Sequence, residues 1–144
     1  MSRIQQWLLE NKKKLGCDFI GIACNVAPEN KPKEIRWLYV AGNQSEAYKH
    51  IRLQVGRGIA GIVWKTARTK LDEHISSQPE KLLDYPIARI EQLESVLAVP
   101  VLEKNEVAAV LMIGFHQDHI YKLTEVKELE EISNQLRQYL KEES

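Results

Sequence analysis

Cysteine, an excess of one charge and long apolar runs are all scarce or missing in this chain. Only two of the 144 residues are cysteines, and 20 lysines and arginines balance 20 aspartates and glutamates. Without net charge, no overall field recruits nucleic acid or an acidic membrane surface. No run approaches the roughly 18 apolar residues of a membrane span, and the chain opens without an apolar signal region. We therefore expect a cytoplasmic protein with no nucleic-acid or membrane partner, in which any anionic ligand is held locally.

The two cysteines, Cys17 and Cys24, lie near the two ends of a short apolar run. If that run is one strand, which rises about 3.3 Å per residue, a disulfide cannot span it. We expect both to be buried, reduced thiols. Metal-binding patterns are also missing. There is no CxxC or HxxxH spacing, and His116, Asp118 and His119 lack a fourth nearby ligand, so no metal site is expected.

Glycine is infrequent but clustered, in the pattern Gly56-x-Gly58-x-x-Gly61, between a strand-like run and a helix-like one. Glycines let the backbone turn tightly and approach a ligand closely. The first turn of the following helix leaves N–H groups without partners, which attracts anions. Nucleotide-binding loops are disfavoured: no GxxxxGK[ST] phosphate-binding loop is present, and Asp72 and Glu73 come too early to reach the ribose of a dinucleotide. The segment predicts a local anion site at the start of the helix.

Helical periodicity marks both ends of the chain. Apolar residues spaced by threes and fours predict an N-terminal helix that stops at Gly16 and a C-terminal helix capped by Thr124. The apolar stripes of both helices are longer than one face of a small sheet needs, so an exposed remainder is expected to serve a homodimer or a partner protein. The stripe residues are Ile4, Trp7, Leu8 and Leu15, then Leu123, Val126, Leu129, Ile132, Leu136 and Leu140.

Between the helices, strand signals are separated by turn residues. Residues 71–93 lack a clear period and predict a long binding loop. With no repeat or linker, the pattern predicts one α+β domain over residues 1–144, with an antiparallel sheet, terminal helices on one face and a ligand pocket on the other. The expected strands are Phe19–Cys24, Ile35–Ala41, Ile51–Val55, Val96–Leu102 and Val107–Phe115, with hairpin turns at 28–32, 42–45 and 103–106.

In this order of elements, the chain resembles a GAF domain. The resemblance also rests on GRGIAGIVWKTART at 56–69 and on the hairpin VLAVPVLEKNEVAAVLMIGF at 96–115. Within that family it is similar to the NreA nitrate receptors, through IRWLYVAGNQSEAYKHIRLQVGRGIAGIVWKTART at 35–69. Two features depart from the NreA pattern: Arg57 replaces a lysine between the glycines, and residues 69–73 differ from the strand that usually follows the helix.

The resemblance implies a nitrate receptor, not an enzyme, that works beside an oxygen-sensing histidine kinase and needs no cofactor. Nitrate is planar, singly charged and weakly hydrated, so a few backbone N–H donors and flat apolar walls suffice to hold it. The glycine segment supplies such donors around Gly58, Ile59 and Ala60. The residues that the resemblance places around nitrate are Trp37, Ile59, Ala60, Tyr85, Pro86 and Ile87.

Each of these residues also has a purely structural interpretation. Trp37 fits an ordinary core position in a strand. Ile59 and Ala60 fit the start of a buried helix face, which is compatible with amides that face a ligand. Tyr85 and Ile87 flank Pro86, and a Tyr-Pro dipeptide in a loop fits a turn packed on the surface.

Other functions remain open at this point. Free methionine-(R)-sulfoxide reductases are GAF enzymes that use loop cysteines, and residues 71–93 contain none. Cyclic-nucleotide binding lacks an evident set of groups for a purine. A structural dimerisation module needs only the amphipathic terminal helices.

Overall fold

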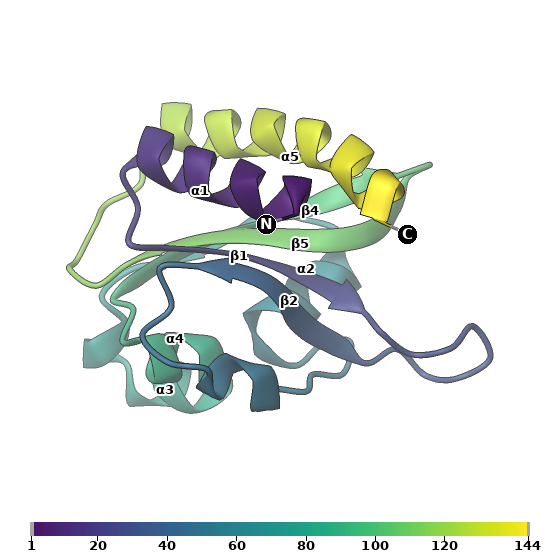
Figure 1. The fold of residues 1–144 in the computed structure, drawn as a ribbon. Helices are drawn as coiled ribbons and strands as arrows, with labels where there is room; N and C mark the ends of the chain where they lie inside the picture. Colours follow the sequence, from purple (N-terminus) through teal and green to yellow (C-terminus); the bar gives the residue numbers. More distant parts are fainter. Residues whose placement is uncertain (1, 144) are drawn as a thin grey trace.

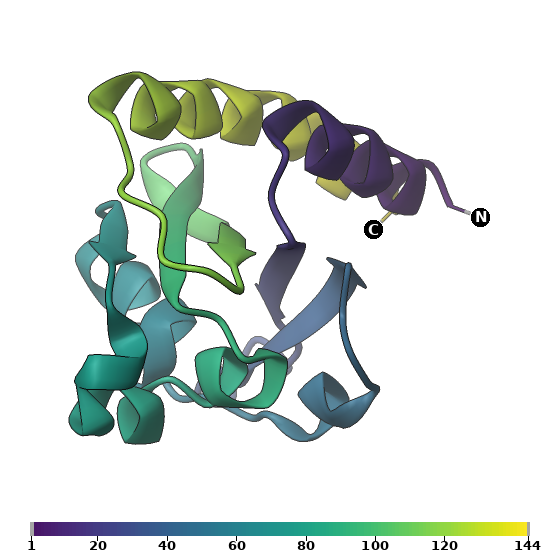
Figure 2. The same ribbon diagram turned by 90° about the vertical axis from the view of Figure 1, so that its left-hand side faces the viewer.

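The computed structural model describes residues 2–143 and contains a five-stranded antiparallel sheet in the order β2-β1-β5-β4-β3. Helices α1 and α5 lie side by side across one face, and the shorter helices lie on the other (Figures 1 and 2). The predicted α+β class is confirmed. The strands are β1 Phe19–Asn25, β2 Ile35–Ala41, β3 Lys70–Asp72, β4 Ser95–Glu103 and β5 Glu106–Phe115. The helices are α1 Arg3–Leu15, η1 Ala47–His50, α2 Gly58–Thr66, η2 Ile75–Ser77, α3 Pro79–Asp84, α4 Pro86–Glu91 and α5 Leu123–Glu143.

The ends of the terminal helices follow from local capping. Helix α1 stops at Gly16, which adopts a left-handed conformation (φ 67°) and donates its N–H to the carbonyls of Lys12 and Lys13, as a C-terminal glycine does. This confirms the predicted stop. The predicted cap at Thr124 is wrong, because α5 already begins at Leu123. The Glu125 carboxylate instead accepts the N–H of Lys122 at 2.8 Å, in the manner of the carboxylate of a capping box.

The sheet separates two hydrophobic cores, because successive strand residues point to opposite faces. In β4, Val96 and Ala98 join the core beneath the sheet, whereas Leu97 and Val99 join the core under α1 and α5. We call the first the pocket-side core and the second the helix-side core. The apolar stripe of α5 is largely covered by the sheet. Among the large apolar residues of α1 and α5, only Leu9 and Leu123 are exposed, so the expected apolar remainder for a partner shrinks to these two.

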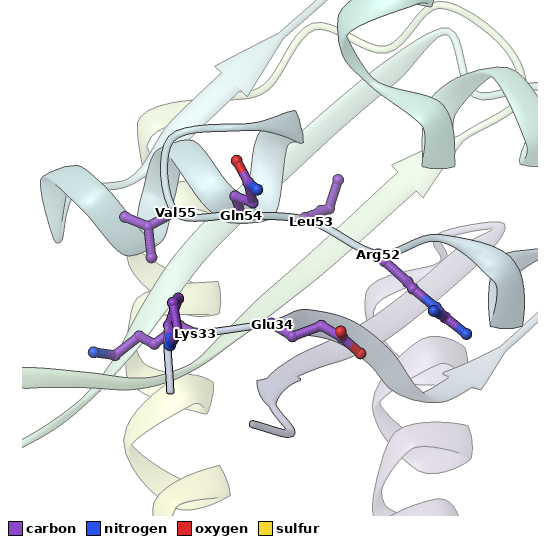
Figure 3. Close-up of a pocket in the computed structure, with 7 residues that line it drawn as sticks. Lys33, Glu34, Arg52, Leu53, Gln54 and Val55 are labelled. Carbon is purple, nitrogen blue, oxygen red and sulfur yellow. The ribbon is translucent and has the colours of Figure 1, made fainter. Parts of the chain in front are cut away.

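The predicted strand Ile51–Val55 is wrong. It forms a single bridge in which Leu53 and Ile35 exchange both backbone hydrogen bonds, at 2.8 and 3.0 Å. Figure 3 shows residues 52–55 as irregular chain beside the start of β2. The preceding turn of η1 and the tight turn at Gly56 (φ 90°) carry the chain away from the sheet, so pairing stops after one step. Consequently, residues 42–45 connect β2 to η1 and are not a hairpin loop.

The region 71–93 contains more regular structure than the long binding loop that was predicted. It begins within β3, which pairs with β4 at the far edge of the sheet, and it then forms η2, α3 and α4. Proline opens both α3 and α4, at the position where its missing N–H costs nothing.

The β4–β5 hairpin is confirmed at its predicted position. Its two turn residues, Lys104 and Asn105, have positive φ angles of 51° and 68°, which matches the twist of a two-residue hairpin. The loop 28–32 joins β1 and β2, also as predicted. Within residues 2–143, none of the helices is both long enough and apolar enough to cross a lipid bilayer.

Candidate anion-binding site

The first turn of α2 presents backbone N–H groups that no side chain caps. Arg57 occupies the N-cap with an extended backbone, and its side chain makes no capping hydrogen bond. The N–H groups of Gly58, Ile59 and Ala60 belong to the first turn, so they have no acceptor within the helix. Gly58 is required here, because its φ is +66° and a Cβ would lie 2.8 Å from the Leu53 side chain. Helix α2 thus begins at the glycine segment, where the sequence predicted a helix start.

Trp37 lies in β2 with its indole in the pocket-side core. It is 3% exposed and meets Phe19 edge-on, with ring centroids 6.5 Å apart. Gly21 on β1 leaves room for it, since a Cβ there would lie 3.1 Å from the indole. Its Nε1–H is buried without a hydrogen-bond partner among the described residues. An unsatisfied buried donor costs about 1–3 kcal/mol, and an acceptor from outside the protein would relieve that cost.

Tyr85 is buried in the same core, at 1% exposure, and is not the surface turn of the structural interpretation. Its hydroxyl donates to Asp72 Oδ2 at 2.6 Å, which ties α4 to the edge strand β3. Lys70 and Lys81 each lie 3.6 Å from the Asp72 carboxylate. Burial and the neighbouring Asp72 raise the pKa of Tyr85, so its hydroxyl stays protonated and keeps donating. The tyrosine ring is thus fixed in orientation.

Pro86 and Ile87 open α4 directly after Tyr85. The Tyr85 carbonyl accepts the N–H groups of Ala88 and Arg89, at 3.0 and 3.2 Å. Pro86 has no N–H, and the N–H of Ile87 has no acceptor within the helix, because it lies in the first turn. Ile87 adds one more open donor next to an apolar wall.

Five of the predicted residues belong to one core, and two line a hollow beside it. Trp37, Ile59, Ala60, Tyr85 and Ile87 all belong to the pocket-side core. Gly58 and Pro86 line a hollow of about 340 Å³ at its edge, together with Arg57 and Asp84. This core includes residues of β2, α2 and α4. Each of these elements carries an N–H group without a partner among residues 2–143: the indole of Trp37, the first turn of α2 and Ile87.

Sequence reasoning missed two carboxylates that hold this region together. One is Asp72, which anchors Tyr85. The other is Glu91, which is fully buried and accepts the N–H of Gln44 at 2.7 Å through Oε1. Burial raises the pKa of Glu91, and its Oε2 has no partner within the described chain. No local sequence pattern reveals either contact, because the partners lie 13 and 47 residues apart.

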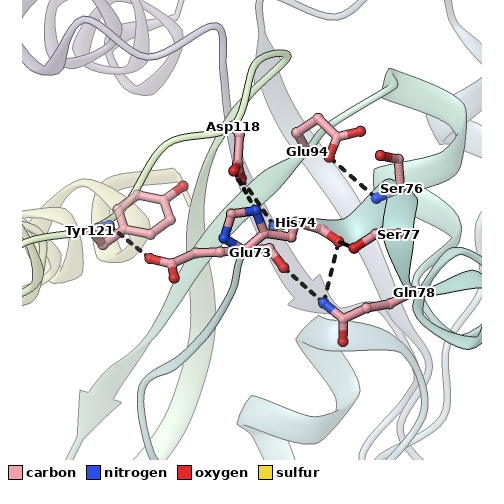
Figure 4. Close-up of polar contacts among 8 residues, drawn as sticks. All are labelled: Glu73, His74, Ser76, Ser77, Gln78, Glu94, Asp118 and Tyr121. Atoms are coloured by element: carbon pink, nitrogen blue, oxygen red, sulfur yellow. Dashed lines mark hydrogen bonds and ion pairs between the residues drawn. The ribbon is translucent and has the colours of Figure 1, made fainter.

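Polar contacts hold the segment 73–78 against the loop between β5 and α5 (Figure 4). The N–H of Tyr121 donates to Glu73 at 2.8 Å, and the N–H of His74 donates to Asp118 at 3.0 Å. His119 does not form a cluster with Asp118, because its Nε2 lies 2.7 Å from the Glu125 carboxylate. Among the residues that the structure describes, no group of three or more histidine, cysteine, aspartate or glutamate side chains is placed to hold a metal ion.

Comparison with known proteins agrees with this architecture. The sequence profile of the GAF domain family matches residues 8–141. The chain belongs to the GAF domain family. No curated protein sequence matches it.

Solved structures give a narrower similarity. A mutated NreA protein from Staphylococcus aureus, altered in its nitrate binding site, is 38% identical, with 80% of this chain and 84% of that chain covered and a TM-score of 0.75. A second mutated NreA structure from the same organism is 36% identical over 88% of this chain and 97% of that chain, with a TM-score of 0.76. The predicted resemblance to NreA is confirmed.

More distant structures share the fold alone. A type II free methionine-R-sulfoxide reductase from Thermoplasma acidophilum is 16% identical, with 97% of this chain and 90% of that chain covered and a TM-score of 0.77. At that identity the likeness carries no information about activity.

Proposed function

We propose that this protein is a nitrate receptor whose binding site is formed by Trp37, the first turn of α2 and the segment 85–87. The observation that carries the proposal is the buried Nε1–H of Trp37, which has no partner within residues 2–143 and lies in the same core as Ile59, Ala60, Tyr85 and Ile87. Similarity to NreA proteins with a nitrate binding site supports the identity of the anion.

The chemistry of the site suits a weakly hydrated monoanion. Its donors are neutral: the indole N–H and the open backbone N–H groups of α2 and α4. Of the basic side chains nearby, Lys70 and Lys81 both contact Asp72, whereas Arg57 lines the hollow beside Gly58. Neutral donors with apolar walls do not replace the hydration of a dianion such as sulfate, whose desolvation costs far more. The site is therefore expected to select nitrate over sulfate and phosphate.

A reductase function is disfavoured by the thiols. Burial raises the pKa of Cys17 and of Cys24 to about 11 in each case, so both stay protonated near neutral pH. The thiolate is the reactive form of cysteine, and a raised pKa disfavours that form at both positions. The cysteines lie at and just before β1, and residues 71–93 contain none. A receptor role needs neither thiol.

A receptor without chemistry acts by changing a surface that another protein recognises. We propose that the nitrate-free protein binds a sensor histidine kinase and lowers its phosphorylation, and that nitrate relieves this effect. By linkage, the kinase then lowers the nitrate affinity of this protein by the same factor as nitrate lowers its kinase affinity. A homodimer through the terminal helices and a cytoplasmic location remain expectations of the same proposal.

The kinase role is tested by autophosphorylation of the candidate kinase with this protein present, with nitrate or with an equal concentration of chloride. Slower phosphorylation without nitrate, restored by nitrate, is the expected result. Equal rates in all conditions would reject the regulatory role and leave nitrate binding unaffected.

A further inference from the structure

A cleft of about 580 Å³ opens at the end of the sheet where β1 and β2 are joined. Its walls are two stretches of extended chain, residues 32–34 and residues 52–55 (Figure 3). They pair only through Ile35 and Leu53, and beyond this bridge they separate. The cleft is distinct from the candidate nitrate site, since none of the predicted nitrate residues lines it.

Each wall has one residue whose backbone is open for hydrogen bonding. If the antiparallel pairing continued past Ile35 and Leu53, Lys33 would face Val55 and exchange two more hydrogen bonds with it. Within the described chain, neither Lys33 nor Val55 makes a hydrogen bond. An open strand edge of this kind accepts another extended segment as an added strand.

The cleft is also cationic. Two basic residues and one acidic residue line it, and the chain around it, residues 25–58, contains six basic and three acidic side chains. Two of those acids are already paired, Glu34 with Arg36 at 3.9 Å and Glu46 with Lys49 at 3.0 Å. Lys33 and Arg52, which extend toward opposite ends of the cleft, have no acidic partner among residues 2–143 (Figure 3). Two basic side chains without acidic partners beside an open strand edge favour an acidic peptide segment as the ligand.

The same segment continues into the candidate nitrate site. Leu53 packs so closely on Gly58 that a Cβ there would lie 2.8 Å from its side chain. The turn between them is held by hydrogen bonds from Arg57 N–H to Gln54 O at 3.0 Å and from Gly56 N–H to Gly61 O at 2.7 Å. An anion bound at the first turn of α2 would therefore affect the position of residues 52–55, which form one wall of the cleft.

We propose that this cleft docks an extended, acidic segment of the regulated partner, which adds as a strand between Lys33 and Val55. Its coupling to nitrate rests on the function proposed above, whereas the docking itself does not. Nitrate-bound and nitrate-free forms then differ in their affinity for the segment, because both ligands contact residues 52–60.

The test uses the whole protein and a capped hexapeptide that alternates glutamate with valine. Amide resonances of Lys33 and Val55 are expected to shift in NMR spectra on addition of this peptide, and not on addition of one that alternates lysine with valine. Titration calorimetry gives the affinity for Lys33→Glu/Arg52→Glu. It is expected to fall about tenfold or more, because two surface ion pairs become like-charge contacts. The matched control, Lys13→Glu/Arg68→Glu, changes the net charge equally and is expected to bind as wild type does.

The outcomes separate the two proposals. Nitrate, compared with chloride at equal ionic strength, is expected to weaken peptide binding about fivefold or more. Peptide binding that survives Lys33→Glu/Arg52→Glu, or no peptide binding at all, would overturn the docking cleft. Peptide binding that nitrate leaves unchanged would overturn the coupling. A protein that binds the peptide but shows no heat with nitrate would overturn the nitrate receptor and leave the cleft standing.

Discussion

Replacing Trp37 with phenylalanine isolates one hydrogen-bond donor in the candidate site. The change keeps an aromatic ring in the pocket-side core but removes the buried Nε1–H, which has no partner within the described residues. If that N–H binds nitrate, the variant loses a hydrogen bond to an anion. Such a bond contributes about 1.5–3 kcal/mol, so the dissociation constant for nitrate is expected to rise about 10- to 150-fold.

Stability is expected to change much less than affinity in Trp37→Phe. The smaller ring leaves a cavity that lowers the free energy of unfolding by about 1 kcal/mol. Removal of an unsatisfied buried donor raises it by about 1–3 kcal/mol. Trp37→Ala, by contrast, empties a position that is 3% exposed and is expected to cost about 3–5 kcal/mol of unfolding free energy. Phenylalanine is therefore the substitution that separates binding from folding.

Titration calorimetry with nitrate and urea unfolding on the same preparations give the two quantities. Trp7→Phe is the matched control, because Trp7 is equally buried but lies in the helix-side core. The control is expected to keep wild-type nitrate affinity. A folded Trp37→Phe that binds nitrate as tightly as wild type would refute the assignment of the indole N–H to the site.

Further predictions concern the groups around the site. Tyr85→Phe removes a 2.6 Å hydrogen bond to Asp72 and is expected to cost about 1–3 kcal/mol in urea unfolding; no loss would mean that the contact does not stabilise the fold. Burial raises the pKa of Glu91 above 4.5, so the carboxylate destabilises the folded state as pH rises through that raised pKa. Glu91→Gln should therefore melt higher than wild type at neutral pH, and this advantage should vanish on acidification; an advantage that grows in acid would contradict the sign. Gly58→Ala should lower both melting temperature and nitrate affinity, and more than Gly16→Ala, because both glycines have positive φ but only Gly58 is crowded; equal effects would refute the packing argument.

The elements that the sequence predicted well are those whose pattern is long and local. Helix α1 combines an apolar stripe with a terminal glycine, and the β4–β5 hairpin alternates residues between two cores around a short polar turn. The segment 51–55 has the same alternation, yet it is not a strand. Its alternate side chains are buried beneath the sheet, and burial alone gives the same pattern as pairing. Strand β3 is only three residues long and leaves Leu71 exposed, so it is too short to show an alternation of apolar and polar residues.

For the candidate site, the sequence predicts the proposed ligand-binding residues but not the contacts that hold them in place. The sequence predicts Gly58, Ile59 and Ala60 because clustered glycines before a helix mark its first turn, where backbone N–H groups have no acceptor within the helix. Tyr85 came from family resemblance alone, and its burial depends on Asp72, a contact that no sequence period encodes. Long-range polar contacts of this kind require the fold before they can be found.

The measurement that tests the central claim most directly is calorimetric titration of the purified protein with nitrate and with sulfate, at constant ionic strength and neutral pH. Neutral N–H donors with apolar walls predict saturable heat with nitrate and none with sulfate, because the dianion loses more hydration than the site restores. Tight sulfate binding, or no heat with nitrate, would contradict a nitrate site built from Trp37 and the first turn of α2.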